Sequence, residues 1–193
     1  MNNSYKILLS ASLLENFGDN LIGPFYAVFV EQIGGSFLDL GYSVTLFSIC
    51  TGILMIIIGR ISDKLNKELI TIAGYALYAL GSLLYLTISS PWQLFGLQIV
   101  FALGTACLSA PLTALFAKYI TKGKEGLQWG LEGGGAYIVV GIAVLIGTFM
   151  VNQWGFEILF FTMFLIQVSA VIVQTKLYFV TRKTKASHKK DVC

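Results

Sequence analysis

Acidic and amide side chains recur along one face of the first apolar stretch of the chain. Glu15 and Asp19 are four residues apart, so on a helix they share one face. The whole row, called the polar stripe below, consists of Ser12, Glu15, Asn16, Asp19, Asn20, Gly23 and Tyr26. A carboxylate can exchange a proton or pair with a cation, and each charge inside a membrane costs about 2.5–3.5 kcal/mol, so the stripe should face water or protein. The structural alternative is pairing with Lys6 or a hydrogen-bond network between helices.

Other polar residues inside apolar stretches extend this set of candidates. Glu132 is a third acid, which either joins the same chemistry or forms a structural ion pair with Lys118. A short polar row either lines a cavity or holds helices together, and it consists of Gln98, Thr105 and Ser109. Tyr137 is a candidate aromatic wall. Packing is the expected role of three further tyrosines, namely Tyr75, Tyr78 and Tyr85.

The composition places these acids in a membrane. The chain has 193 residues, of which 56% are hydrophobic and 12% charged, whereas a soluble domain carries about 25% charged residues. A soluble domain of this size lacks the polar surface to cover so much apolar side chain. We therefore predict an all-α integral membrane protein. The only histidine, His188, lies in the polar C-terminal tail and the cysteines fit no metal pattern, so we expect no metal site and no cofactor.

Apolar stretches of about 20 residues, long enough to cross a membrane as helices, define the expected elements. Six of them form a transmembrane domain over residues 1–180, at about 7–30, 42–60, 69–88, 92–117, 129–151 and 157–180. A basic tail follows over 181–193 and should lie near anionic lipid head groups. All 13 Lys and Arg residues lie toward the two termini or in the second and fourth loops. Because positive loops stay inside, we predict a multi-pass protein of the cell (inner, cytoplasmic) membrane with both termini cytoplasmic.

The second of these loops carries a short charged motif. Its residues are Gly59, Arg60, Asp63, Lys64 and Lys67, with Asn66 between the last two. The loop resembles the Gly-x-x-x-Asp-Arg/Lys-x-Gly-Arg/Lys-Arg/Lys signature of the major facilitator superfamily, with Asn66 in place of the second glycine. Asp63 can cap the next helix or face the positive end of another helix, and the lysines can bind lipid phosphates. The alternative interpretation is a charged turn that only sets the topology.

The resemblance covers nearly the whole chain and implies one six-helix half of a twelve-helix transporter. In this family two halves surround a cavity at the middle of the membrane. Glu15 lies nine residues before Pro24, as an acidic residue does in many drug and tetracycline antiporters of the superfamily. This similarity implies proton coupling through Glu15 with support from Asp19. The fourth apolar stretch resembles a second family motif, although Gln98 stands where that motif has arginine.

A single half leaves its polar stripe without an opposite wall. We therefore hypothesise a proton-coupled exporter of small organic molecules that works as a parallel homodimer with alternating access. An alternative is that the chain is the N-terminal half of a longer transporter. A different class of function is a non-transporting membrane scaffold or assembly subunit. No enzymatic activity is expected, and the expected partners are a small-molecule substrate, protons, membrane lipids and a second copy, with no nucleic acid.

Overall fold

The computed structural model describes the backbone of residues 2–190 and the side chains of residues 2–182, and this part of the chain contains helices and no strands. The elements are α1 (Asn3–Asp19), the 3-10 helix η1 (Gly23–Phe25), α2 (Tyr26–Gln32), α3 (Phe37–Ser62), α4 (Lys67–Leu84), the 3-10 helix η2 (Tyr85–Thr87), α5 (Pro91–Tyr119) and α6 (Glu125–Lys190). Four described segments are long and apolar enough to cross a membrane: Phe37–Ser62, Lys67–Thr87, Pro91–Tyr119 and Glu125–Arg182. The prediction of an all-α membrane protein is confirmed at this level. Of the expected basic tail, residues 191–193 lie outside the described residues.

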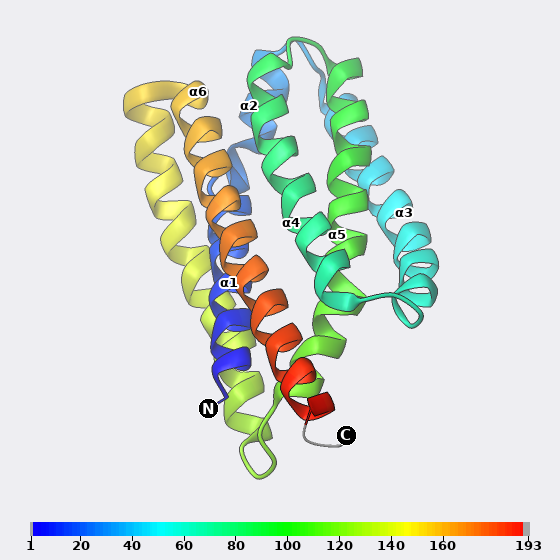
Figure 1. The fold of residues 1–193 in the computed structure, drawn as a ribbon. Coiled ribbons are helices and arrows are strands. Elements are labelled where there is room, and N and C mark those ends of the chain that lie inside the picture. Colours follow the sequence, from blue (N-terminus) through cyan, green and yellow to red (C-terminus); the bar gives the residue numbers. More distant parts are fainter. Residues whose placement is uncertain (1, 191–193) are drawn as a thin grey trace.

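Helix α6 reverses direction at Gly155, whose φ of 78° lies in the left-handed region that glycine adopts without steric cost. We call residues 125–154 the first limb of α6 and residues 156–190 its second limb. The two limbs lie side by side in Figure 1, in yellow and orange. The start of α1, the α3–α4 and α5–α6 loops and the last turns of the second limb lie toward one end of the bundle, opposite the Gly155 turn (Figure 1). The two lysine-rich loops therefore share one end.

The first apolar stretch is not the continuous helix that was expected over 7–30. Helix α1 ends at Asp19, and the chain passes through η1 before α2 begins at Tyr26. Gly23 has a φ of 21°, and Pro24 lacks a backbone N–H and disfavours helical conformation in the residue before it. The Asn20 side chain donates a 2.9 Å hydrogen bond to the Asn16 carbonyl, so the end of α1 is capped by a residue of the polar stripe.

The helices pack in pairs around one aromatic core. Helix α1 packs mainly on α6, α3 on α5, and α4 on both α5 and α6. Two contacts set the antiparallel register of α4 on the second limb. The rings of Tyr85 and Phe160 stack with their centroids 4.6 Å apart, and Gln174 Nε2 donates to Thr71 Oγ1 at 2.7 Å. Of the four long apolar segments, α3 is the least covered by other helices, because only 6% of its most apolar 18-residue stretch is buried.

Candidate transport site

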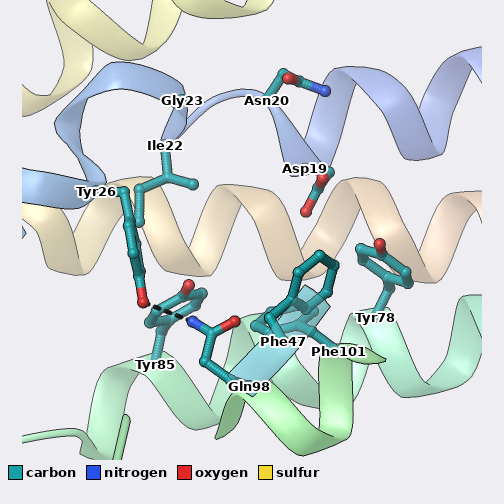
Figure 2. Close-up of a pocket in the computed structure, with 10 residues that line it drawn as sticks. All are labelled: Asp19, Asn20, Ile22, Gly23, Tyr26, Phe47, Tyr78, Tyr85, Gln98 and Phe101. Atoms are coloured by element: carbon teal, nitrogen blue, oxygen red, sulfur yellow. Dashed lines mark hydrogen bonds between the residues drawn. The ribbon is translucent and has the colours of Figure 1, made fainter. Parts of the chain in front are cut away.

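The polar stripe of α1 lines two adjoining pockets. The Asp19 pocket has a volume of about 280 Å³ and is formed by Asp19, Asn20, Ile22, Gly23, Tyr26, Phe47, Tyr78, Tyr85, Gln98 and Phe101 (Figure 2). The Glu15 pocket has a volume of about 320 Å³ and is formed by Ser12, Glu15, Asn16, Tyr78, Thr105, Leu108, Ser109, Leu112, Thr113 and Glu132. Tyr78 belongs to both linings, so the pockets meet at its ring. Every residue of the polar stripe lines one pocket or the other.

The Asp19 pocket forms where the first span is broken. Because the helix stops at Asp19, the η1 segment places Tyr26 opposite Gln98 of α5 (Figure 2). Gln98 Nε2 donates to the Tyr26 hydroxyl at 2.6 Å, and this hydroxyl donates to Ser43 Oγ at 2.8 Å. Ser43 in turn donates to the Leu40 carbonyl at 2.8 Å. A hydrogen-bonded chain thus links α5, the broken span and α3 across one wall of the pocket.

The Glu15 pocket lies further toward the lysine-rich end and joins α1, α4, α5 and the first limb of α6. Asn16 Nδ2 donates to Glu15 Oε2 at 3.2 Å, so one carboxylate oxygen already has a polar partner within the stripe. The hydroxyls of Tyr78 and Thr105 are 2.8 Å apart and share a hydrogen bond. The Ser109 hydroxyl donates to the Thr105 carbonyl, and this hydrogen bond lies within α5 rather than between two helices. Thr105 and Ser109 therefore line a pocket, and only Thr105 also links two helices.

The charged side chains that line these pockets are all acidic. Glu15 and Glu132 line one pocket and Asp19 the other, and no Lys, Arg or His of the described residues joins either lining. Lys6 forms no ion pair with Glu15 or Asp19 within the described part of the chain. Carboxylates beside the faces of aromatic rings attract cations. The linings therefore offer carboxylates and polar groups to a bound molecule, with no cationic side chain among the described residues.

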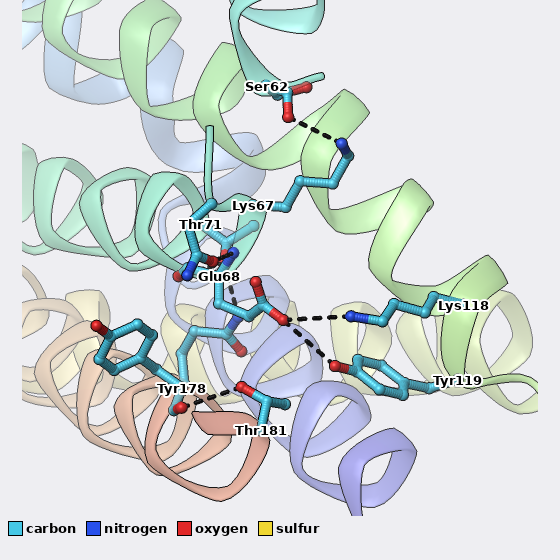
Figure 3. A network of polar contacts seen from close by, with 10 residues as sticks. Ser62, Lys67, Glu68, Thr71, Lys118, Tyr119, Tyr178 and Thr181 are labelled. Atoms are coloured by element: carbon cyan, nitrogen blue, oxygen red, sulfur yellow. Dashed lines mark hydrogen bonds and ion pairs between the residues drawn. The ribbon is translucent and has the colours of Figure 1, made fainter. Parts of the chain in front are cut away.

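Lys118 pairs with Glu68 and not with Glu132, although an ion pair with Lys118 was one of the two roles considered for Glu132. Its Nζ lies 3.6 Å from Glu68 Oε1, and the hydroxyl of Tyr119 donates to the same oxygen at 3.3 Å (Figure 3). Glu68 lies in the first turn of α4 and is only 5% exposed, so its carboxylate gains from a cationic partner. Glu132 is left without an ion-pair partner among the described residues and lines the Glu15 pocket instead.

The charged motif of the α3–α4 loop lies away from both pockets. The Asp63 side chain is 80% exposed and lies 3.6 Å from Lys67 Nζ, which also donates to the Ser62 carbonyl at 2.8 Å (Figure 3). Asn66 is the cap of α4, because its side chain accepts from the Glu68 N–H. Asn66, the residue that departs from the family pattern, therefore has the capping role for which Asp63 was a candidate. The rest of the motif is exposed or only partly covered at Gly59, Arg60 and Lys64.

The aromatic residues that line the two pockets differ from the one that the sequence singled out. Tyr137 is 83% exposed and lines neither pocket. Tyr78 and Tyr85, which were expected only to pack, line the Asp19 pocket as well as filling the core. Their spacing of seven residues on one face of an otherwise apolar helix was the available signal. Phe47 and Phe101 complete the wall and carried no such signal, because phenylalanine is common on every face of a membrane helix.

The structure thus shows a bundle of apolar helices in which acids and amides gather on two adjoining open pockets. The sequence model described as Major Facilitator Superfamily matches residues 8–192. The chain therefore belongs to this superfamily of membrane transporters, and its class is that of a transporter rather than an enzyme.

The relatives differ in how much of their length the chain covers. The chain is 25% identical over 147 residues to the uncharacterized MFS-type transporter YitZ of Bacillus subtilis, covering 75% of this chain and 88% of that protein. It is 29% identical over 160 residues to the multidrug resistance protein MdtH of Photorhabdus laumondii, covering 80% and 39%. A transporter of Methanocaldococcus jannaschii, MJ1560, is 26% identical over 165 residues, covering 83% and 42%. The chain thus spans most of one half-size relative and about two fifths of two longer ones.

Proposed function

We propose that the chain is a proton-coupled secondary transporter that exports small organic molecules. The observation that carries this proposal is the gathering of the whole polar stripe, with two carboxylates free of ion pairs among the described residues, onto two adjoining open pockets. A purely structural stripe would be expected to pair its charges within the core, because an unpaired buried charge is costly. The multidrug resistance name of one relative agrees with a small organic substrate.

In this proposal Glu15 carries the proton and Asp19 contacts the substrate. The two acids lie in different pockets that adjoin at Tyr78. Because charges interact strongly over short distances where the dielectric constant is low, protonation of Glu15 changes the binding energy of a cation beside Asp19. Protonated Glu15 weakens cation binding, and a bound cation favours loss of the proton. Exchange of proton and substrate between two states open to opposite sides is antiport. Glu132 lies at the cytoplasmic side of the same pocket as a further exchangeable acid.

We propose six membrane spans with both termini in the cytoplasm. The broken first span (α1 to α2), then α3, α4 with η2, and α5, and finally the two limbs of α6, supply them. The end of the bundle that carries the α3–α4 and α5–α6 loops holds Lys64, Lys67, Lys122 and Lys124, which supports this orientation. The basic segment beyond residue 180 then meets anionic lipid on the cytoplasmic side.

A second six-span unit completes the working transporter, and we propose that it is a second copy in a parallel arrangement. Helix α3 is nearly uncovered, and the first limb of α6 has glycines at 126, 130 and 133 with no atom within 4 Å of an added Cβ. The exposed Asp63 of one copy would face the start of the partner's first limb, where helix N–H groups favour a carboxylate. The longer relatives favour a second arrangement, in which another segment of a longer protein supplies this unit.

Substitution of Glu15 by Gln tests the transport role. Purified protein in liposomes that contain a pH-sensitive dye should move protons when ethidium, an organic cation, is added outside. Glu15→Gln should abolish this movement and leave the melting temperature within a few degrees of the wild type. Glu31→Gln is the matched control, because Glu31 is an exposed acid of α2 that lines neither pocket. Equal proton movement in the wild type and in Glu15→Gln would falsify the role of Glu15, and a wild type that moves no protons would favour the scaffold.

Cysteine crosslinking in membranes tests the dimer. With the native cysteines replaced, cysteines at positions 63 and 127 should form a crosslinked product with the mass of two chains. A pair at positions 89 and 127 is the control, because residue 89 lies in the α4–α5 loop at the opposite end of the bundle. If only monomers are recovered from the first pair, this interface between two copies is wrong.

A further inference from the structure

The buried face of α4 is polar along its whole length. Residues three or four apart on this face and on η2, which continues it, are Glu68, Thr71, Tyr75, Tyr78, Ser82 and Tyr85, and each is at most 6% exposed. The remainder of α4 is apolar, as a membrane helix requires. Burying polar groups in a membrane bundle is unfavourable unless each has a hydrogen-bond partner. Thr71 and Ser82 donate to carbonyls of α4 itself and Tyr78 shares a hydrogen bond with Thr105, so it is the Tyr75 hydroxyl of this row that calls for a further polar partner or for water.

The second limb of α6 supplies polar groups opposite this face. Gln167 and Gln174 lie two turns apart on one face of it, and both are fully buried. The antiparallel register places Gln174 beside Thr71, with the amide donating to the hydroxyl at 2.7 Å. In the same register Tyr75, one turn further along α4, lies between the levels of Gln174 and Gln167. We call this buried row between the two helices the α4–α6 seam.

Three polar atoms of the seam have no hydrogen-bond partner in the described part of the chain. They are the Tyr75 hydroxyl, Gln167 Oε1 and Gln174 Oε1, all on residues with no exposed surface. Five buried side-chain atoms lack a partner among the described residues, so most of them fall in this one seam. Such buried groups in proteins are commonly bridged by ordered water that makes two to four hydrogen bonds. The seam offers water donors and acceptors from both helices.

One end of the seam reaches the proposed proton carrier. Gln167 Nε2 donates to the backbone carbonyl of Glu15 at 3.2 Å. Tyr75 itself lines neither the Asp19 pocket nor the Glu15 pocket. The seam therefore reaches the backbone of Glu15 through Gln167, and its residues Tyr75, Gln167 and Gln174 belong to the lining of neither pocket.

The other end reaches the lysine-rich end of the bundle. Thr71 Oγ1 accepts from Gln174 and donates to the Glu68 carbonyl at 3.0 Å (Figure 3). The Glu68 carboxylate faces Lys118, whose side chain is 51% exposed to the surroundings. Tyr119 is hydrogen-bonded to the same carboxylate. Glu68 thus sits between the buried row and groups that reach the surface.

We infer that ordered water in the α4–α6 seam conducts protons between Glu15 and Glu68, by a route separate from the pockets that hold the substrate. The inference rests on the proposed function. A proton leaves the Glu15 carboxyl for the first water, each water accepts one proton and releases one, and the Glu68 carboxylate passes one proton to the cytoplasmic solvent. The glutamines do not carry protons but hold the waters in line, together with the Tyr75 hydroxyl. Glu15 can then lose its proton while the substrate still occupies the pockets.

Tyr75→Phe is the sharpest test, because it removes one oxygen that makes no hydrogen bond within the described chain. A structural role predicts unchanged proton movement and equal or greater stability. The seam predicts ethidium-driven proton movement about tenfold slower in the liposome assay, because the water chain loses one of the hydrogen bonds that hold it. Ethidium affinity should stay unchanged. Thr51→Val is the matched control, because the Thr51 hydroxyl is also buried without a partner but lies on α3, outside the seam.

A measurement of water completes the test without relying on transport. Hydroxyl radicals made by brief X-ray exposure label buried side chains that contact ordered water, so Tyr75 should be labelled although it has no exposed surface. Labelling should fall severalfold when Gln167 and Gln174 are both replaced by Leu. If Tyr75 is not labelled, the proton route through the seam is wrong. It is also wrong if Tyr75→Phe moves protons like the wild type while Glu15→Gln abolishes proton movement, and in either case the proposed function is unaffected. A wild type that moves no protons overturns the proposed function itself.

Discussion

Gly147 of the first limb permits the closest approach of two backbones at the break in the first span. A Cβ added to Gly147 would overlap the carbonyl oxygen of Leu21 and lie 2.9 Å from the Leu21 carbonyl carbon. These are backbone atoms of the segment that shapes the Asp19 pocket, so they cannot move aside by a rotamer change. Overpacking costs about 1–3 kcal/mol, and a backbone clash belongs at the upper end. Alanine regains about 1 kcal/mol of helix propensity, so Gly147→Ala should cost roughly 2 kcal/mol net.

Two other glycines give a graded series for the same substitution. At Gly18 the added Cβ would meet the Gln167 amide at 2.9 Å, and this side chain can swing away at the cost of its hydrogen bond to Glu15. That loss of about 1 kcal/mol cancels the gain in propensity, so Gly18→Ala should be close to neutral. At Gly96 nothing lies within 4 Å. Gly96→Ala should therefore stabilise the protein by about 0.5–1 kcal/mol.

Thermal unfolding in detergent measures the series, with a maleimide dye that reports exposure of the buried Cys107 thiol. One kcal/mol shifts the melting temperature of a chain of this size by about 2–4 °C. We expect a fall of about 4–8 °C for Gly147→Ala, little change for Gly18→Ala and a rise of about 1–4 °C for Gly96→Ala. If Gly147→Ala melts at or above the wild type, the close packing of the first limb against Leu21 is wrong.

Three further substitutions probe the pocket and its surroundings. Tyr26→Phe deprives the buried Gln98 amide of its acceptor and should lower stability by about 1–2 kcal/mol, seen as a lower melting temperature. Lys118→Met leaves Glu68 buried without its cation and should cost about 1–2 kcal/mol after allowance for the half-exposed lysine, with recovery when Glu68→Gln is added. Asp19→Asn should weaken ethidium binding about tenfold, equivalent to roughly 1.4 kcal/mol, and leave binding of a neutral molecule of similar size unchanged. Equal losses for the two ligands would argue against charge recognition by Asp19.

The site was partly predictable from the sequence because helical periodicity is a local property. The spacing of the polar stripe identified one face of the first span, and in the structure this whole face lines the two pockets. The sequence left two roles open for Gln98, Thr105 and Ser109, lining a cavity or holding helices together, and in the structure all three line a pocket. It assigned packing to Tyr78 and did not show that this ring also lines both pockets, because the rotation of each helix about its axis depends on the neighbours it packs against.

The amino-acid sequence by itself determined the membrane class, the superfamily and the polar face of the first span. Hydropathy, charge distribution and a loop motif report these directly, since each depends on residues close together in the chain. Only the tertiary structure decided that Lys118 pairs with Glu68, that Asn66 caps α4, and that Gln174 meets Thr71. These contacts join residues that are far apart in sequence or compete for one role. The partner that each residue contacts depends on the register and rotation of the packed helices. These are set by the fit of whole helix surfaces rather than by any one sequence pattern.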